Sequence, residues 1–206
     1  MMPVSTSEGE RPAGASGRPR DVRADRAILD AALQSFIEDG YKGMSIEGVA
    51  ARAGVGKTTI YRRWGSKQEL IVGAIDSLFE DLHVPDTGDV RADLTSLVEQ
   101  AHRFITQTKA GDVLPRMVAE VASGTPLGRA YFEKVMGPRL GTILDTLEAA
   151  KERGDLRSDL DDHLSLASII GSMMFLRLTR TLPESREDLA ERLVTQLVEG
   201  IGPQDQ

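Results

Sequence analysis

The segment with the clearest chemical potential runs from Ala53 to Trp64 and reads AGVGKTTIYRRW. Its Gly56-Lys57-Thr58 triplet resembles the end of a nucleotide-binding loop, G-x-x-x-x-G-K-[ST], whose backbone amides hold phosphates. That loop needs a glycine where this chain has Ala51, and it must follow a buried strand. The preceding residues instead place apolar side chains at 46, 49, 50 and 53, which is helical spacing. A helical interpretation is therefore favoured over a phosphate loop.

The same residues can form a recognition helix. Two short helices, from Ser45 to Ala53 and from about Lys57 to Trp64, are joined by a tight turn at Gly54 and make a helix-turn-helix. On the outer face of the second helix, Lys57 can bond guanine O6 and N7, Thr58 offers a hydroxyl and a methyl group, and Tyr61 can contact a thymine methyl group or a phosphate.

Charge supports this interpretation without deciding it. The second helix carries four cations, at 57, 62, 63 and 67, and no acid on its expected outer face. Residues 1–67 hold 11 Lys/Arg and 8 Asp/Glu, a net charge of +3, whereas residues 68–206 hold 14 and 24, a net charge of −10. A weakly basic front suits contact with a polyanion. The alternative is a solvated basic face on a helical protein that binds no DNA.

Further DNA contacts are expected at the edges of this motif. Ser45 and Lys67 open the flanking helices and could bond the DNA backbone at phosphates. Arg18 and Arg20 precede the first helix, and a flexible arginine arm there could enter the adjacent minor groove. An ordinary basic linker is the alternative for this arm.

The whole chain predicts an all-α protein. From Val22 onward, apolar residues recur at helical spacing in about nine segments separated by Gly and Pro, with no convincing strand pattern. Residues 1–20 are rich in Gly, Pro, Ser and Ala and are expected to be disordered. Pro138 lies inside a long helical segment, about 126–153, and is expected to kink or split it.

Enzyme and membrane functions find little support. The three histidines are scattered and show no metal-binding spacing, and no G-x-S-x-G motif is present. No metal, cofactor or catalytic residue is therefore expected, and acids near position 160 are interpreted as helix caps. The chain has no Cys, no secretory signal and no apolar run of membrane-spanning length, which predicts a cytoplasmic protein. A helical adaptor for other proteins remains a third possibility.

The stretch RAILDAALQSFIEDGYKGMSIEGVAARAGVGKTTIYRRWGSKQEL resembles the DNA-binding domain of the tetracycline-repressor (TetR) family. The similarity rests on A-x-x-x-F-x-x-x-G-Y from Ala32 to Tyr41, the helix start at Ser45, and AGVGKTTIYRRW followed by K-x-E-L. Gly56 and the Arg63-Trp64 pair depart from the residues common there, which leaves the base contacts open. The resemblance implies a homodimeric, ligand-responsive repressor on a palindromic operator, with Lys57, Thr58 and Tyr61 facing bases.

By the same resemblance, phosphates would be contacted by Ser45, Thr59, Arg63 and Lys67, with Arg62 ambiguous and Trp64 an anchor within the fold. The expected organisation is an arm at 1–20, a three-helix DNA-binding domain at 21–67 and a helical effector-binding and dimerisation domain at 68–206. The partners implied are double-stranded DNA, a second copy of the chain and a small apolar effector, with no membrane.

Two groups of residues in the second domain complete the expectations. Small and apolar residues on the last two helices suit a four-helix dimer interface: Ala167, Gly171, Leu189, Leu193 and Leu197. The resemblance to the TetR family implies an effector cavity between these helices and the first domain. Adaptable Met side chains and aromatics there suit an apolar ligand, although such residues also form ordinary core: Phe104, Met117, Val121, Phe132, Met136, Met173 and Met174.

Overall fold

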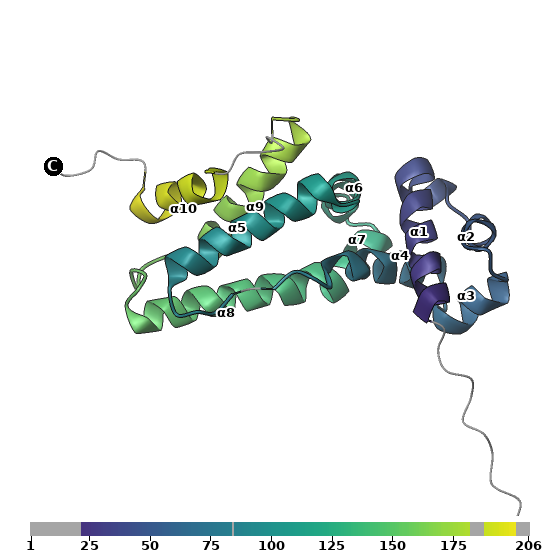
Figure 1. Cartoon of the computed structure of the whole chain (residues 1–206), viewed down its shortest axis with the longest axis horizontal. Coiled ribbons are helices and arrows are strands. Elements are labelled where there is room, and N and C mark those ends of the chain that lie inside the picture. Colours follow the sequence, from purple (N-terminus) through teal and green to yellow (C-terminus); the bar gives the residue numbers. More distant parts are fainter. Residues whose placement is uncertain (1–21, 84, 182–187, 201–206) are drawn as a thin grey trace, which may run out of the picture.

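The computed structural model describes residues 22–83, 85–181 and 188–200, and all regular elements within these ranges are helical (Figure 1). The predicted all-α class is therefore confirmed. The predicted disorder at 1–20 and the predicted break at Leu182-Pro183 lie outside the described residues. The elements are α1 (Val22–Gly43), α2 (Ile46–Ala53), α3 (Lys57–Arg63), α4 (Lys67–Asp76), η1 (Ser77–Phe79), α5 (Val90–Gln107), α6 (Ala110–Ala122), α7 (Pro126–Tyr131), η2 (Phe132–Met136), α8 (Gly137–Arg153), α9 (Asp162–Leu178) and α10 (Leu189–Glu199).

The molecule has a head and a body, joined by α4. The head comprises α1, α2 and α3 (22–63), and the body comprises the helices from α5 to α10 (90–199); α4 lies between them (Figure 1). One apolar core runs from Ile28 in α1 through Ile71 in α4 to Val194 in α10. The core is thus continuous across residue 67, where the sequence predicts a boundary between two domains.

Local capping sets the bounds of the helices in the head. Ser45 Oγ accepts a hydrogen bond from the Gly48 amide at 3.0 Å, which caps α2 as predicted. Gly54 ends α2 with a φ of 66°, a left-handed conformation that favours glycine. Ser66 Oγ accepts from the Glu69 amide at 3.1 Å, while the Glu69 carboxylate accepts from the Gly65 amide at 2.9 Å. A capping box therefore forms at the start of α4, with its return bond one residue earlier than the standard pattern.

A π-helical turn interrupts the long helical run from Pro126 to Arg153. The Gly137 amide bonds to the Phe132 carbonyl, five residues back, and Pro138 follows in the first turn of α8. Proline has no amide hydrogen and its ring collides with the carbonyl four residues earlier, so a wider turn before it relieves the conflict. The predicted disturbance at Pro138 is confirmed.

The number of helical runs also agrees with the sequence. Since η1 continues α4, and since α7, η2 and α8 form one run, the described residues contain nine helical runs, as predicted.

Charged side chains from the body hold the head from two sides. Arg116 of α6 donates to the Ile37 carbonyl of α1 at 2.9 Å, and Lys109, which immediately precedes α6, places Nζ 3.1 Å from the Asp30 carboxylate of α1. On α8, Arg139 lies 2.9 Å from Asp76 at the end of α4. These contacts supplement the apolar core at the junction.

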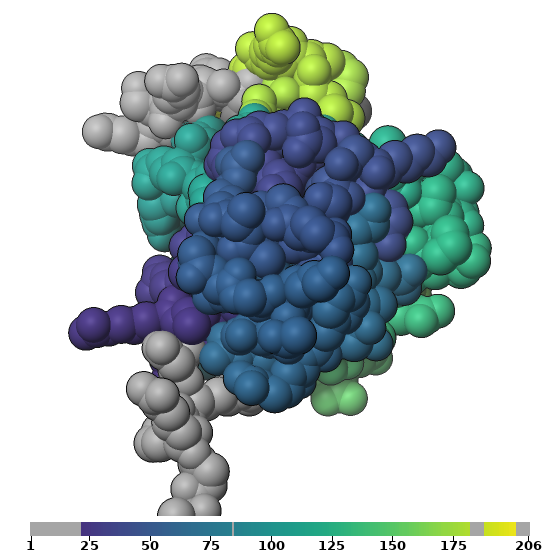
Figure 2. Space-filling model, turned by 90° about the vertical axis from the view of Figure 1, so that its right-hand side faces the viewer, coloured from purple at the N-terminus to yellow at the C-terminus, as the bar shows by residue number. Residues whose placement is uncertain are grey.

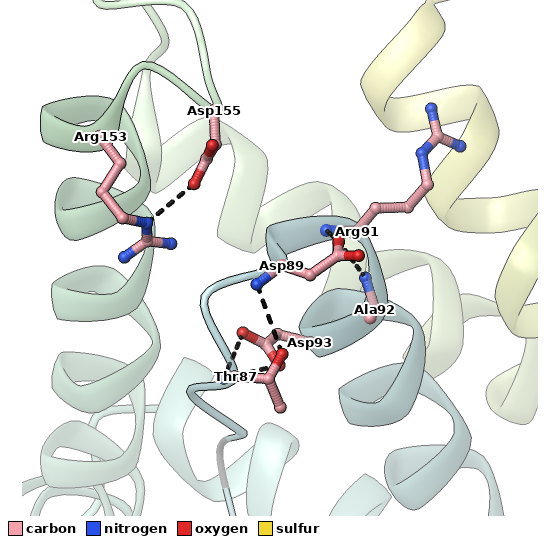
Figure 3. A network of polar contacts seen from close by, with 7 residues as sticks. All are labelled: Thr87, Asp89, Arg91, Ala92, Asp93, Arg153 and Asp155. Carbon is pink, nitrogen blue, oxygen red and sulfur yellow. Dashed lines mark hydrogen bonds and ion pairs between the residues drawn. The ribbon is translucent and has the colours of Figure 1, made fainter.

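A buried carboxylate organises the chain between α4 and α5. Asp93 is only 2% exposed, and it accepts hydrogen bonds from the Thr87 hydroxyl at 2.7 Å and the Thr87 amide at 3.0 Å (Figure 3). Asp89 caps α5 by accepting from the Arg91 and Ala92 amides, both at 3.0 Å. Arg91 in turn reaches Glu199 of α10 at 2.8 Å, so this turn connects the first and last helices of the body.

We predict that Asp93→Ala lowers the free energy of unfolding by about 2 kcal/mol, because hydrogen bonds to a buried charged group are lost. Urea unfolding at fixed protein concentration measures the change. Asp155→Ala is the control: that carboxylate pairs with Arg153 at a site where both side chains are 36% exposed, and the expected loss is within about 0.5 kcal/mol (Figure 3). Equal losses in the two variants would contradict the role assigned to Asp93.

Candidate nucleic-acid interface

The outer surface of α2 and α3 forms one end of the molecule, remote from the body (Figures 1 and 2). Lys57, Thr58, Tyr61 and Arg62 of α3 are all exposed there, and Tyr61 keeps 49% of its surface accessible. An exposed lysine, hydroxyl, phenol and guanidinium on one short helix provide donors that match the acceptor atoms of bases and phosphates.

One buried side chain and one half-buried ring hold α3 against the rest of the head. Ile60 is the buried residue of α3 and has no exposed surface. Trp64 ends the helix and packs against the core, with its indole nitrogen 3.1 Å from where a Cβ on Gly73 of α4 would lie. The interpretation of Trp64 as an anchor within the fold is confirmed. These contacts leave the opposite face of α3 free.

Two of the four cations expected on this face lie elsewhere. The Arg63 side chain is 10% exposed and forms an ion pair with Asp25 in the first turn of α1. Lys67 Nζ donates to the Tyr41 carbonyl at 2.8 Å and the Met44 carbonyl at 3.1 Å, and it lies 4.6 Å from the centre of the Tyr41 ring. The expectation that all four cations lie on the outer face is wrong for Arg63 and Lys67, because acceptors at the two ends of α1 lie beside them.

The surface also carries an acid that the sequence did not lead us to expect there. Glu47, in the first turn of α2, places Oε1 3.6 Å from Nζ of Lys57. Both side chains remain largely exposed, at 66% and 60%. No spacing rule links positions 47 and 57, because they face each other only through the geometry of the turn between the helices.

The remaining predicted DNA contacts divide into three cases. Ser45 is exposed while its hydroxyl caps α2, and Thr59 is half-buried. Arg18 and Arg20 lie outside the described residues.

Arg52, which the sequence did not single out, forms an ion pair with Glu38 of α1. The hydrogen bonds that Glu38 accepts from Arg52, together with one from Gln34, lower the pKa of Glu38 to about 2. That pair ties α2 to α1 and balances the charge of Arg52.

The predicted effector contacts lie mostly inside the body. Phe104, Met117 and Met173 are buried, and the Phe104 ring packs against that of Phe79, with 4.7 Å between ring centres and the planes tilted by 48°. Val121, Met136 and Met174 are partly buried against the same core, whereas Phe132 is 46% exposed. Six of the seven predicted residues therefore share one apolar interior, and Phe132 lies at its surface.

The predicted dimer residues lie on α9 and α10, the last two helices of the body (Figure 1). On α9, Ala167 and Gly171 are exposed within an apolar stripe that includes Leu164, Phe175 and Leu178, at 65%, 64% and 54% exposure. On α10, Leu189 and Leu193 are partly buried against the core of their own chain, and Leu197 is 36% exposed. The stripe on α9 is a surface of unusual apolar content for a helix facing water.

Two kinds of feature are absent from the part of the chain that the structure describes. It contains no group of three or more His, Asp or Glu side chains that could hold a metal ion. None of its helices combines the length and the apolar composition that crossing a membrane requires.

Comparison with known proteins agrees with this arrangement. Residues 28–74 match the profile of "Bacterial regulatory proteins, tetR family", and residues 84–197 match "Tetracyclin repressor-like, C-terminal domain". The HTH-type transcriptional regulator YdeS of Bacillus subtilis is 32% identical over 186 residues, which cover 90% of this chain and 93% of YdeS. The DNA-binding transcriptional repressor TetR of Mycobacteroides abscessus is 35% identical over 156 residues, 74% of this chain and 80% of the repressor.

A solved structure shows the same fold over nearly the whole chain. The TetR family transcription regulator SCO0332 superposes with a TM-score of 0.68 at 29% identity, covering 88% of this chain and all of that one. Regulators of this class are not enzymes, in agreement with the sequence. With one family profile on the helix-turn-helix and another on the body, the chain belongs to the TetR family of transcriptional regulators.

Proposed function

We propose that this regulator is a repressor that binds a palindromic operator as a homodimer and leaves it when a small apolar molecule enters the body. The observation that carries the proposal is the outer face of α3, where Lys57, Thr58, Tyr61 and Arg62 are exposed together while Ile60 holds the helix from behind. A short helix presented in this way suits insertion into the major groove.

Within that proposal the predicted contacts take two roles. Lys57, Thr58 and Tyr61 face bases, and Ser45, Thr59 and Arg62 face the DNA backbone. Arg63 and Lys67 remain predicted phosphate contacts, but their bonds to Asp25 and to the Tyr41 and Met44 carbonyls favour a role in positioning α3 and α4. Arg18 and Arg20 are proposed to reach the minor groove beside the start of α1.

The apolar stripe on α9 supports the homodimer. Exposed Leu164, Phe175 and Leu178 would be buried by a second copy, and Ala167 and Gly171 allow the two α9 backbones to approach closely. Among the described residues, a Cβ at Gly171 would meet no atom within 4 Å beyond its own stretch of α9, so this position leaves space for a partner. Two α9 and two α10 helices would form a four-helix bundle, with Leu197 at its edge.

Release by an effector is supported by the composition of the interior between α5, α6 and α9. Met117, Met173 and Phe104 are buried there, and Met side chains adapt to apolar ligands of varied shape. Such a ligand acts only if it binds one conformation of the dimer better than the other. The favoured conformation must be the one in which the spacing of the two heads does not match the operator. Arg116 of α6 and Lys109, the residue before α6, contact α1, which gives this part of the body a direct connection to the head.

The test of DNA recognition is selection from a random duplex pool by the purified protein at physiological salt, followed by sequencing. Enrichment of a palindrome would support a dimeric operator reader. Failure to enrich any sequence would refute the proposed function.

On the selected operator, we predict that Lys57→Ala and Tyr61→Ala each weaken binding about 10-fold, since a good base contact contributes about 1–3 kcal/mol of discrimination. Fluorescence anisotropy over a range of salt concentrations measures both affinity and its salt dependence. Arg157→Ala removes a positive charge from the body, where the side chain is 72% exposed, and serves as the control with unchanged affinity. Equal effects of Arg157→Ala and Lys57→Ala would indicate a general charge effect and contradict base contact by Lys57.

We predict that Phe175→Glu raises the dissociation constant of the dimer about 30-fold or more, because it places a charge in the centre of the proposed interface. Sedimentation velocity over a dilution series measures this change, and operator affinity should fall with it. Val118→Glu, at a 44% exposed apolar site on α6, is the matched control and should leave the dimer intact. A Phe175→Glu protein that remains dimeric at the same concentrations would rule out the α9 stripe as the interface.

A further inference from the structure

The most informative unassigned feature of the head is the contact between Glu47 of α2 and Lys57 of α3. Their charged atoms lie 3.6 Å apart on the face proposed to meet DNA, and both side chains are more than half exposed. Ion pairs with this exposure contribute little to stability. The pair therefore needs a role other than holding α2 against α3, which the turn at Gly54 and the buried Val49 and Ile60 already do.

A carboxylate on a DNA-facing surface has few partners. An ionised Glu accepts hydrogen bonds and donates none, so it is repelled by phosphates and cannot pair with guanine N7 and O6 or with thymine O4. The donors in the major groove are the amino groups of cytosine N4 and adenine N6. Lysine has the opposite requirement, because its ammonium group only donates.

The surroundings of Glu47 allow it to approach a base edge. Gly48 and Ala51 are exposed next to it on α2 and carry no long side chain that would hold the backbone away from DNA. The register of α2 is fixed by the Ser45 cap and by burial of Ile46, so the position of Glu47 on this face is set.

We infer that Glu47 and Lys57 together read one G·C base pair in each half of the operator. Lys57 donates to guanine N7 and O6, and Glu47 accepts from the N4 amino group of the paired cytosine. A G·C pair offers the ammonium two neighbouring acceptors followed by a donor for the carboxylate. In an A·T pair, the adenine N6 amino group lies between the two acceptors, adenine N7 and thymine O4. With Glu47 on that amino group, the Lys57 ammonium can reach only one of the two acceptors. This inference rests on the proposed function and adds the identity of one base pair to it.

The test compares selection from random duplexes by the wild-type dimer, Glu47→Ala, Glu47→Gln and Lys57→Ala. The wild type should enrich a palindrome with G·C at one position that depends on Glu47. At that position, Glu47→Ala should reduce the preference for G·C about 10-fold while other positions keep their preferences. Glu47→Gln should shift the preference toward adenine, because an amide bonds adenine N6 and N7. Lys57→Ala should also weaken the preference for G·C at this position.

Asp39→Ala is the charge-matched control, since it removes an exposed acid of the head at the end of α1 and should leave all base preferences unchanged. Thermal unfolding followed by circular dichroism confirms that each variant is folded. The inference is overturned if Glu47→Ala strengthens binding to all sequences equally, because Glu47 would then act only as a charge. It is also overturned if the position that depends on Glu47 is A·T. If the wild type enriches no palindrome, the proposed function itself fails, and the two failures are thereby distinguished.

Discussion

The burial of Ile60 is the contact on which the DNA-facing surface depends. A helix of seven residues is too short to be stable by itself, so α3 exists only because it is fixed to the rest of the head. Ile60 supplies the apolar part of that attachment and Trp64 extends it to α4. Since the buried side of α3 provides this attachment, Lys57, Thr58 and Tyr61 on its exposed side are not needed to hold the helix in place.

Much of the head could be predicted from sequence because its elements are set by local chemistry. The Ser45 cap, the left-handed turn at Gly54 and the cap at Ser66 each depend on residues within a few positions of one another. The periodic apolar residues of α1 and α4 likewise follow from helical geometry. The interruption before Pro138 was foreseen for the same reason, since a proline disturbs the hydrogen bonds of its own helix.

The partners of charged residues could not be predicted in this way. Arg63 finds Asp25 across 38 positions, and Lys67 finds carbonyls at the other end of α1, so both appeared free when only their neighbours in sequence were considered. Glu47 was not among the predicted site residues, and only the angle between α2 and α3 brings it to Lys57. Residues of the candidate site that need no partner, such as Tyr61, were easier to identify.

The bonds of Arg63 and Lys67 have a mechanical consequence for the head. Arg63 ties the end of α3 to the start of α1, and Lys67 ties the start of α4 to the end of α1, so α1 acts as a strut fixed at both ends. Deforming the head would break charged contacts at one end or the other. A displacement of the head is therefore expected to move α1, α3 and the start of α4 together rather than to change their relative positions.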